Sequence, residues 1–195
     1  MSALDWLIPG RGRRTTLARE IRAVTASAIK QSESSRLTQR ESVLWELFCS
    51  GAGEVVHQLL VKSQDRRLDW GVRRRWRNID GPRVLTIYWW MLLYHLVLYR
   101  NRGIDGHDPQ EDLPVFREAA QAFLQRELDP LPLEHSPSPW AEKWDEQFVL
   151  ESAMEIYDNV YGLLGRHVDL TTRINRVSLF TTATEQGFNK AIREL

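Results

Sequence analysis

Arginine side chains with a tryptophan among them are concentrated in one segment of the chain. A guanidinium group binds a phosphate through two parallel hydrogen bonds, and an interleaved indole can stack on a base. The segment therefore predicts a binding surface for a protein partner, for nucleic acid or for anionic lipid. The simpler alternatives are a solvated surface and pairing with the acidic half of the same chain. The candidate binding residues are Arg66, Arg67, Arg73, Arg74, Arg75, Trp76 and Arg77.

Two residue pairs have spacings that occur in metal sites. Glu54 and His57 share the Glu-x-x-His spacing of di-iron four-helix bundles, but no second copy of that motif occurs in the chain. The pair His107-Asp108 resembles the paired ligands of metal-dependent HD-type phosphohydrolases, which are all-helical. Here Pro109 follows directly and favours a turn. We therefore expect no metal site, and a metal-dependent hydrolase or oxidase using His57 and His107 remains the last alternative.

Two further residues are reactive types in apolar surroundings. His95 lies within an apolar segment, and burial disfavours the charged form of an imidazole. We expect it to be the most deeply buried polar group, with one hydrogen-bond partner. Cys49 is the one cysteine and is expected to be a buried, unreactive thiol, which fits a reducing compartment. No Walker loop, Gly-x-Gly-x-x-Gly or Gly-x-Ser-x-Gly motif occurs, so no cofactor or catalytic residue is predicted.

The elements that must position these residues are helices, because apolar residues recur three or four positions apart along nearly every long segment. Leu17, Ile21, Val24 and Ala28 form one such stripe. Between Val84 and Tyr99, only Thr86 and His95 are neither apolar nor aromatic. Sixteen helical residues span about 24 Å, which is shorter than a bilayer core of about 30 Å. We therefore predict an all-α fold, an irregular bundle of six or seven helices around the apolar helix 84–99.

Local signals mark several ends and breaks of these helices. Thr38 and Glu41 have the spacing of a capping box at a helix start. Gly51 and Gly53 interrupt an apolar stripe and predict either a kink or a close helix–helix contact. Asp80-Gly81-Pro82 predicts the start of the apolar helix, and Arg100, Arg102 and Gly103 its end.

The second half of the chain is interrupted by loops. We expect a loop over residues 103–112 and then a short helix with Val115, Ala119, Ala122 and Leu128 among its apolar positions. A longer helix is expected from about Trp140 to Leu164, followed by a last helix from Leu170. Four prolines between Asp129 and Pro139 forbid a continuous helix there. The chain is therefore expected to be one domain, 1–195, with a hinge or internal boundary at 129–139.

The formal net charge of zero hides two oppositely charged halves. Residues 1–103 carry 18 Lys and Arg against 9 Asp and Glu, whereas residues 104–195 carry 8 against 17. The two surfaces could satisfy each other within one fold, pair between copies, or bind two different partners. At the N-terminus, Trp6 and Leu7 precede several arginines and resemble a short interfacial membrane anchor, whereas no signal peptide or transmembrane segment is predicted.

These observations favour a non-enzymatic helical adaptor or assembly protein in the cytoplasm. Its oppositely charged faces would bind a protein partner or a second copy of the chain. The alternative is a helical nucleic-acid-binding protein that uses the arginine-rich segment 66–83. Peripheral membrane contact through Trp6 and Leu7 is a variant of the first hypothesis.

Overall fold

The computed structural model describes the chain from residue 11 to residue 193 with gaps. The described residues are 11–34, 37–62, 81–127, 139–140, 151, 153–158, 181–182, 184–186, 188–189 and 192–193. Within these ranges every regular element is a helix, and the predicted all-α fold is confirmed.

Two antiparallel helices form the first layer of the molecule. Helix α1 spans Arg11–Ser34 and buries Leu17, Ile21 and Ala28 of its predicted apolar stripe, whereas Val24 is half-buried. Helix α2 spans Gln39–His57, and a π-helical turn, η2, extends it over Gln58–Lys62. The predicted capping box is present at its start.

The capping box satisfies two amides at the N-terminus of α2. The Thr38 hydroxyl accepts a hydrogen bond from the Glu41 amide at 3.3 Å, and the Glu41 carboxylate accepts one from the Thr38 amide at 2.6 Å. The first-turn amides of a helix have no intrahelical acceptor, so this exchange stabilises the start of α2.

The apolar segment forms the central helix, α4, which spans Gly81–Arg102. Every residue from Met91 to Tyr99 is buried, as is most of the preceding turn. The helix begins at Gly81, as predicted. It ends before Gly103, whose φ of 66° favours glycine and whose amide donates to the Tyr99 carbonyl at 2.8 Å.

Helix α5 spans Pro109–Glu127 and corrects the prediction of a loop over residues 103–112. The loop ends at Asp108, because its carbonyl and carboxylate cap the helix and Pro109 fits the first helical position, which needs no N–H donor. The predicted apolar positions are also wrong in part. Ala119 is buried, but Val115 and Ala122 are only half-buried, and the core residues are Leu113, Phe116, Ala119, Ala120 and Phe123.

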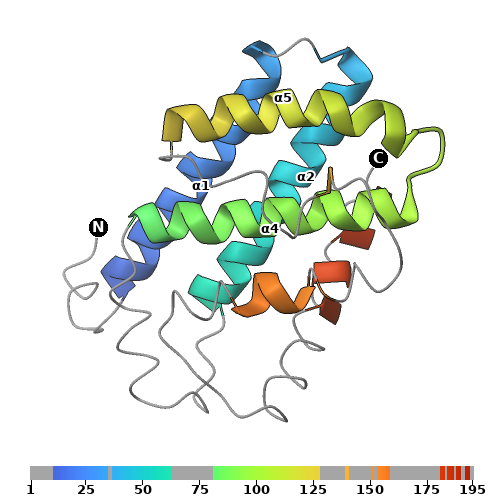
Figure 1. Cartoon of the computed structure of the whole chain (residues 1–195). Coiled ribbons are helices and arrows are strands. Elements are labelled where there is room, and N and C mark those ends of the chain that lie inside the picture. Colours follow the sequence, from blue (N-terminus) through green and yellow to red (C-terminus); the bar gives the residue numbers. More distant parts are fainter. Residues whose placement is uncertain are drawn as a thin grey trace.

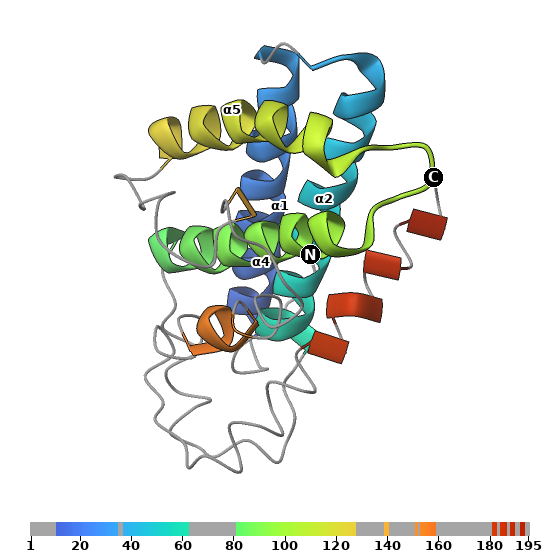
Figure 2. The ribbon, with the colours of Figure 1, turned by 45° about the vertical axis from the view of Figure 1, so that its right-hand side comes forward.

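The helices form two crossed layers. Figure 1 shows α4 and α5 side by side, with α1 and α2 crossing behind them at a steep angle, and Figure 2 shows the same crossing from a second side. Helix α1 contacts both α4 and α5, and α2 contacts α4. None of the helices in the described ranges has the length and apolar composition that crossing a membrane requires.

The two glycines of α2 mark close contacts between helices rather than a break, because α2 continues through them. A Cβ atom on Gly51 would lie 2.8 Å from His95 Nε2 of α4, and one on Gly53 would overlap Thr25 Oγ1 of α1. The expectation of a tight helix–helix contact is therefore confirmed.

Other predictions concern residues that the structure describes only in part. Pro139 and Trp140 form a turn, so the helix predicted from Trp140 does not include that residue. Helical residues are described at 151 and 153–158, where Ala153, Ile156 and Tyr157 are buried. The proposed hinge at 129–139 lies outside the described residues except for Pro139.

Candidate functional site

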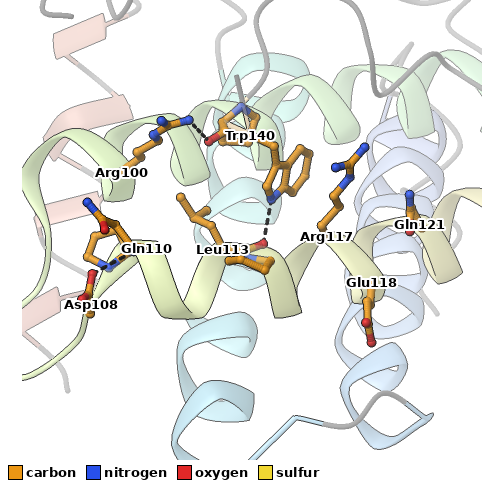
Figure 3. Close-up of a pocket in the computed structure, with 11 residues that line it drawn as sticks. Arg100, Asp108, Gln110, Leu113, Arg117, Glu118, Gln121 and Trp140 are labelled. Carbon is orange, nitrogen blue, oxygen red and sulfur yellow. Dashed lines mark hydrogen bonds between the residues drawn. The ribbon is translucent and has the colours of Figure 1, made fainter. Parts of the chain in front are cut away.

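A groove runs along the outer face of α5 and encloses about 880 Å³ (Figure 3). The end of α4 closes it on one side through Arg100, and the turn Pro139–Trp140 lies across it. Along α5 it follows Gln110, Pro114, Arg117 and Gln121, which recur every three or four residues and therefore share one helical face. The opposite face of the same helix is buried in the core.

Trp140 forms the wall of the groove and is held by its indole nitrogen. Nε1 donates a hydrogen bond to the Leu113 carbonyl of α5 at 2.7 Å. A carbonyl oxygen has two lone pairs, so Leu113 can accept this bond in addition to its helical one. Arg100 secures the same turn, because its Nη1 donates to the Pro139 carbonyl at 2.7 Å. The half-buried indole therefore presents its remaining surface to the groove.

Pro114 changes the hydrogen bonding of α5 at the floor of the groove. A proline has no N–H, so the Gln110 carbonyl lacks its usual donor four residues ahead. Gln110 and Pro114 both line the groove, and both are exposed. The floor therefore offers a main-chain acceptor that an ordinary helical turn would use internally.

Charged side chains border the groove in two groups. Figure 3 shows Arg100 and Arg117 on either side of the Trp140 indole, whereas Asp108 and Glu118 lie along the other edge. Partial burial lowers the pKa of the Arg100 guanidinium, which remains cationic and is bonded to Pro139. Arg117 and Glu118 are exposed and form no hydrogen bond or ion pair within the described part of the chain.

A second polar cluster ties the α4–α5 loop to both layers. Tyr99 donates a hydrogen bond to Asp112, whose Oδ2 lies 3.5 Å from His107 Nδ1. Arg40 Nε donates to His107 Nε2 at 3.4 Å. Burial first, and then the bond to Asp112, raises the pKa of the Tyr99 hydroxyl. His107 Nε2 accepts the bond from Arg40, whereas Nδ1, although 3.5 Å from Asp112, has no hydrogen-bond partner in the described residues. The cluster therefore fastens the loop to α2 through Arg40 and to α4 through Tyr99.

The structure separates the three histidines that sequence reasoning singled out. His107 contacts Arg40 at the start of α2, and His57 lies 17 residues further along that helix, about 25 Å away. His95 lies between them against Gly51. Among the residues that the structure describes, no group of three or more His, Cys, Asp or Glu side chains is placed to hold a metal ion.

His95 and Cys49 are buried as predicted, but His95 is not the most deeply buried polar residue, because Thr184 is 0% exposed. His95 is 1% exposed, its Nδ1 lies 2.7 Å from the Met91 carbonyl, and its Nε2 has no hydrogen-bond partner in the described residues. Burial lowers the His95 pKa to about 4, so the ring is neutral at physiological pH. Burial also raises the pKa of the Cys49 thiol, which leaves it protonated and unreactive.

In comparisons with known proteins, no family model, no curated protein and no solved structure matches the chain. The candidate site is therefore interpreted from its own geometry.

The predicted binding residues and the groove are different parts of the chain. Arg66, Arg67, Arg73, Arg74, Arg75, Trp76 and Arg77 all lie outside the described residues, as do Trp6 and Leu7. Sequence reasoning missed the groove, although Pro114 inside a helix was a visible signal. The contact between Trp140 and Leu113 joins residues 27 positions apart and has no periodic signature.

Proposed function

We propose that the protein is a non-enzymatic interaction module whose groove along α5 binds a protein partner. The observation that carries the proposal is the row of outward polar side chains on α5, Gln110, Arg117 and Gln121, beside an indole fixed by the Trp140–Leu113 hydrogen bond. Indole and guanidinium groups are enriched among the residues that dominate binding energy at protein interfaces. The proposal places the module in the cytoplasm, where its single thiol stays reduced.

Site-specific crosslinking in cells expressing the full chain tests this proposal. A photoreactive benzophenone amino acid replaces Glu118, which is exposed at the edge of the groove, and in a matched variant it replaces Arg19, which is exposed on α1. We expect discrete protein adducts from the Glu118 position and none from the Arg19 position. Equal adducts at both positions, or none at Glu118, would contradict the proposal.

The arginine-rich segment supports a second candidate, a nucleic-acid-binding protein. Arg73, Arg74, Arg75 and Arg77 surround Trp76, and the first half of the chain carries twice as many basic as acidic residues. Each phosphate contact releases counterions, so the affinity of such a surface falls steeply with salt.

Fluorescence anisotropy with labelled single- and double-stranded nucleic acid at low and physiological salt tests this candidate. Steeply salt-dependent binding that is lost when Arg73, Arg74, Arg75 and Arg77 become Gln would support it. An absence of binding at low salt would contradict this candidate and would favour a protein as the partner of the arginine-rich segment. Co-sedimentation with anionic vesicles tests the membrane variant, in which Trp6→Ala with Leu7→Ala is expected to abolish sedimentation.

A further inference from the structure

We propose that the groove binds an extended, proline-rich peptide that carries one acidic side chain. This inference rests on the proposed function and narrows its partner to one class of peptide. It is argued from the length of the groove, its hydrogen-bonding groups, its apolar walls and its free cation.

The length of the groove suits a short extended peptide. Gln110 and Gln121 stand at its two ends on α5, and 11 helical residues span about 16 Å. A polyproline II helix rises about 3.1 Å per residue, so about five residues of such a peptide would span the same length. A volume of about 880 Å³ is also within the range of about 300–1,000 Å³ for ligand pockets.

The polar side chains of the groove can donate hydrogen bonds to the unpaired backbone carbonyls of the peptide. A polyproline II helix has no internal hydrogen bonds, so its carbonyl oxygens need donors. Gln110, Arg117 and Gln121 supply such donors along one line, and none of these three side chains has a partner in the described residues. Along α5, Gln110 and Arg117 are about 10 Å apart, and Arg117 and Gln121 are about 6 Å apart. Three and two residues of a polyproline II helix cover these distances.

The apolar walls suit pyrrolidine rings. Trp140, Pro109, Pro114 and Pro139 supply rigid, flat surfaces. Because Trp140 Nε1 is already bonded to Leu113, the indole is held in place before a ligand arrives, which reduces the entropy lost on binding. Aromatic-lined grooves are the recurring docking sites of proline-rich segments.

Other peptide geometries fit the groove less well. A helical partner needs a continuous apolar stripe, whereas polar side chains occupy the outer turns of α5 at Gln110, Arg117 and Gln121. Strand addition needs an exposed sheet edge, and the described ranges contain only an isolated bridge between Ile104 and His107.

Arg117 is the reason for proposing an acidic side chain in the peptide. Its guanidinium is exposed beside the indole and has no acidic partner within the described ranges, whereas Arg100 is bonded to Pro139. A carboxylate can accept two parallel hydrogen bonds from a guanidinium, which orients the peptide in the groove.

Anisotropy with the full chain and a fluorescein-labelled peptide of alternating Pro and Leu that ends in Glu tests the inference. We expect a dissociation constant below about 100 μM. Trp140→Ala and Gln121→Ala are each expected to weaken binding, Trp140→Ala by at least tenfold. Arg117→Ala is expected to weaken it severalfold, and replacing the peptide Glu with Gln is expected to have no further effect on that variant. Arg19→Ala on α1 is the matched control and is expected to bind as the natural chain does.

Three results would overturn the inference. The first is no binding at about 1 mM peptide. The second is equal affinity for a peptide in which every Pro is replaced by Ala, which would leave the interaction module standing with a different ligand class. The third is unchanged affinity in Arg117→Ala and Gln121→Ala, whose substitutions lie outside the core and keep the test valid if Trp140→Ala fails to fold. The crosslinking at Glu118 decides the proposed function independently of all three.

Discussion

At the scale of single residues, His95 connects local packing to the pH dependence of the whole fold. Its Nδ1 donates to the Met91 carbonyl, its Nε2 faces Gly51, and its ring lies 6.1 Å from that of Phe188. The surroundings therefore stabilise the neutral ring, and a proton on Nε2 would have no acceptor among the described residues.

We predict that the free energy of unfolding falls by about 2 kcal/mol between pH 7 and pH 4.5 through His95 alone. The folded-state pKa is about 4, below the ordinary value of 6.5, so the unfolded chain takes up the proton first as the pH falls. The contribution is fully present above pH 6.5 and is lost as the pH falls toward 4. Urea unfolding at the two pH values measures it, and His95→Leu should show a pH dependence smaller by that amount. An unchanged slope in this variant would contradict the assignment.

A second prediction concerns the space in front of this histidine. Gly51→Ala places a Cβ 2.8 Å from His95 Nε2 and should destabilise the fold by about 1–3 kcal/mol, despite the better helix propensity of Ala. Gly81→Ala is the matched control, because a Cβ there meets nothing within 4 Å. Thermal unfolding compares the two variants. A Gly51→Ala protein as stable as the control would show that the helices can separate at little cost.

At the scale of elements, the helix α5 is interrupted in its hydrogen bonding at a residue that also lines the groove. Pro114 leaves the Gln110 carbonyl without its helical donor, and its ring is one of the apolar walls of the groove. The same residue therefore weakens the helix and shapes the binding surface.

We predict that Pro114→Ala raises the free energy of unfolding by about 1–3 kcal/mol. The same substitution is expected to weaken binding of the proline-rich peptide severalfold. The substitution restores an N–H for the Gln110 carbonyl, and a proline inside a helix is about 3 kcal/mol less favourable than alanine. Pro109→Ala is the control for stability, since the first helical position needs no donor. Urea unfolding and peptide anisotropy on the same samples measure both effects. Tighter binding by the stabilised variant would contradict the role given to Pro114.

Predictability from sequence also differs between elements. The limits of α4 follow from Gly81-Pro82 and from Gly103, because these residues act on the backbone next to them. The start of α5 was mispredicted because Pro109 suits both a turn and a first helical position. The groove could not be predicted, since it depends on Trp140 meeting Leu113 across 27 residues. Periodicity likewise located Gly51 on the inner face of α2, but only the packing shows that His95 fills the space beside it.

At the scale of the whole molecule, Phe48 joins the layers through one aromatic cluster. Its ring lies 5.1 Å from Tyr99 of α4 and 5.8 Å from Phe116 of α5. It also stacks on Phe188, at 6.1 Å, from the C-terminal part of the chain. One side chain of α2 thus contacts three other segments.

We predict that Phe48→Ala destabilises the fold by about 3–5 kcal/mol, because it opens a cavity where these segments meet. Val43→Ala on the same helix is the control, since Val43 is 47% exposed and its loss should change stability by less than about 0.5 kcal/mol. Guanidinium unfolding measures the difference. A loss below about 1 kcal/mol for Phe48→Ala would show that the cluster rearranges to fill the cavity.

The opposite charges of the two halves meet at least once within the fold. Arg102 at the end of α4 forms an ion pair with Glu185 at 2.8 Å. Both side chains are more than a third exposed, so solvent screening limits this pair to at most about 1 kcal/mol. Some of the basic charge of the first half is therefore paired with acidic charge of the second half within the fold.

The contacts of Gly51 and Gly53 also have a consequence for the divergence of this protein over time. Each glycine shares its space with one side chain of another helix, Gly51 with His95 and Gly53 with Thr25. A descendant that acquires a larger residue at either glycine must acquire a smaller one at the facing position, so the two positions are expected to change together. Distant relatives can therefore be recognised by two correlated pairs, Gly51 with His95 and Gly53 with Thr25, even where the surface has diverged beyond overall similarity.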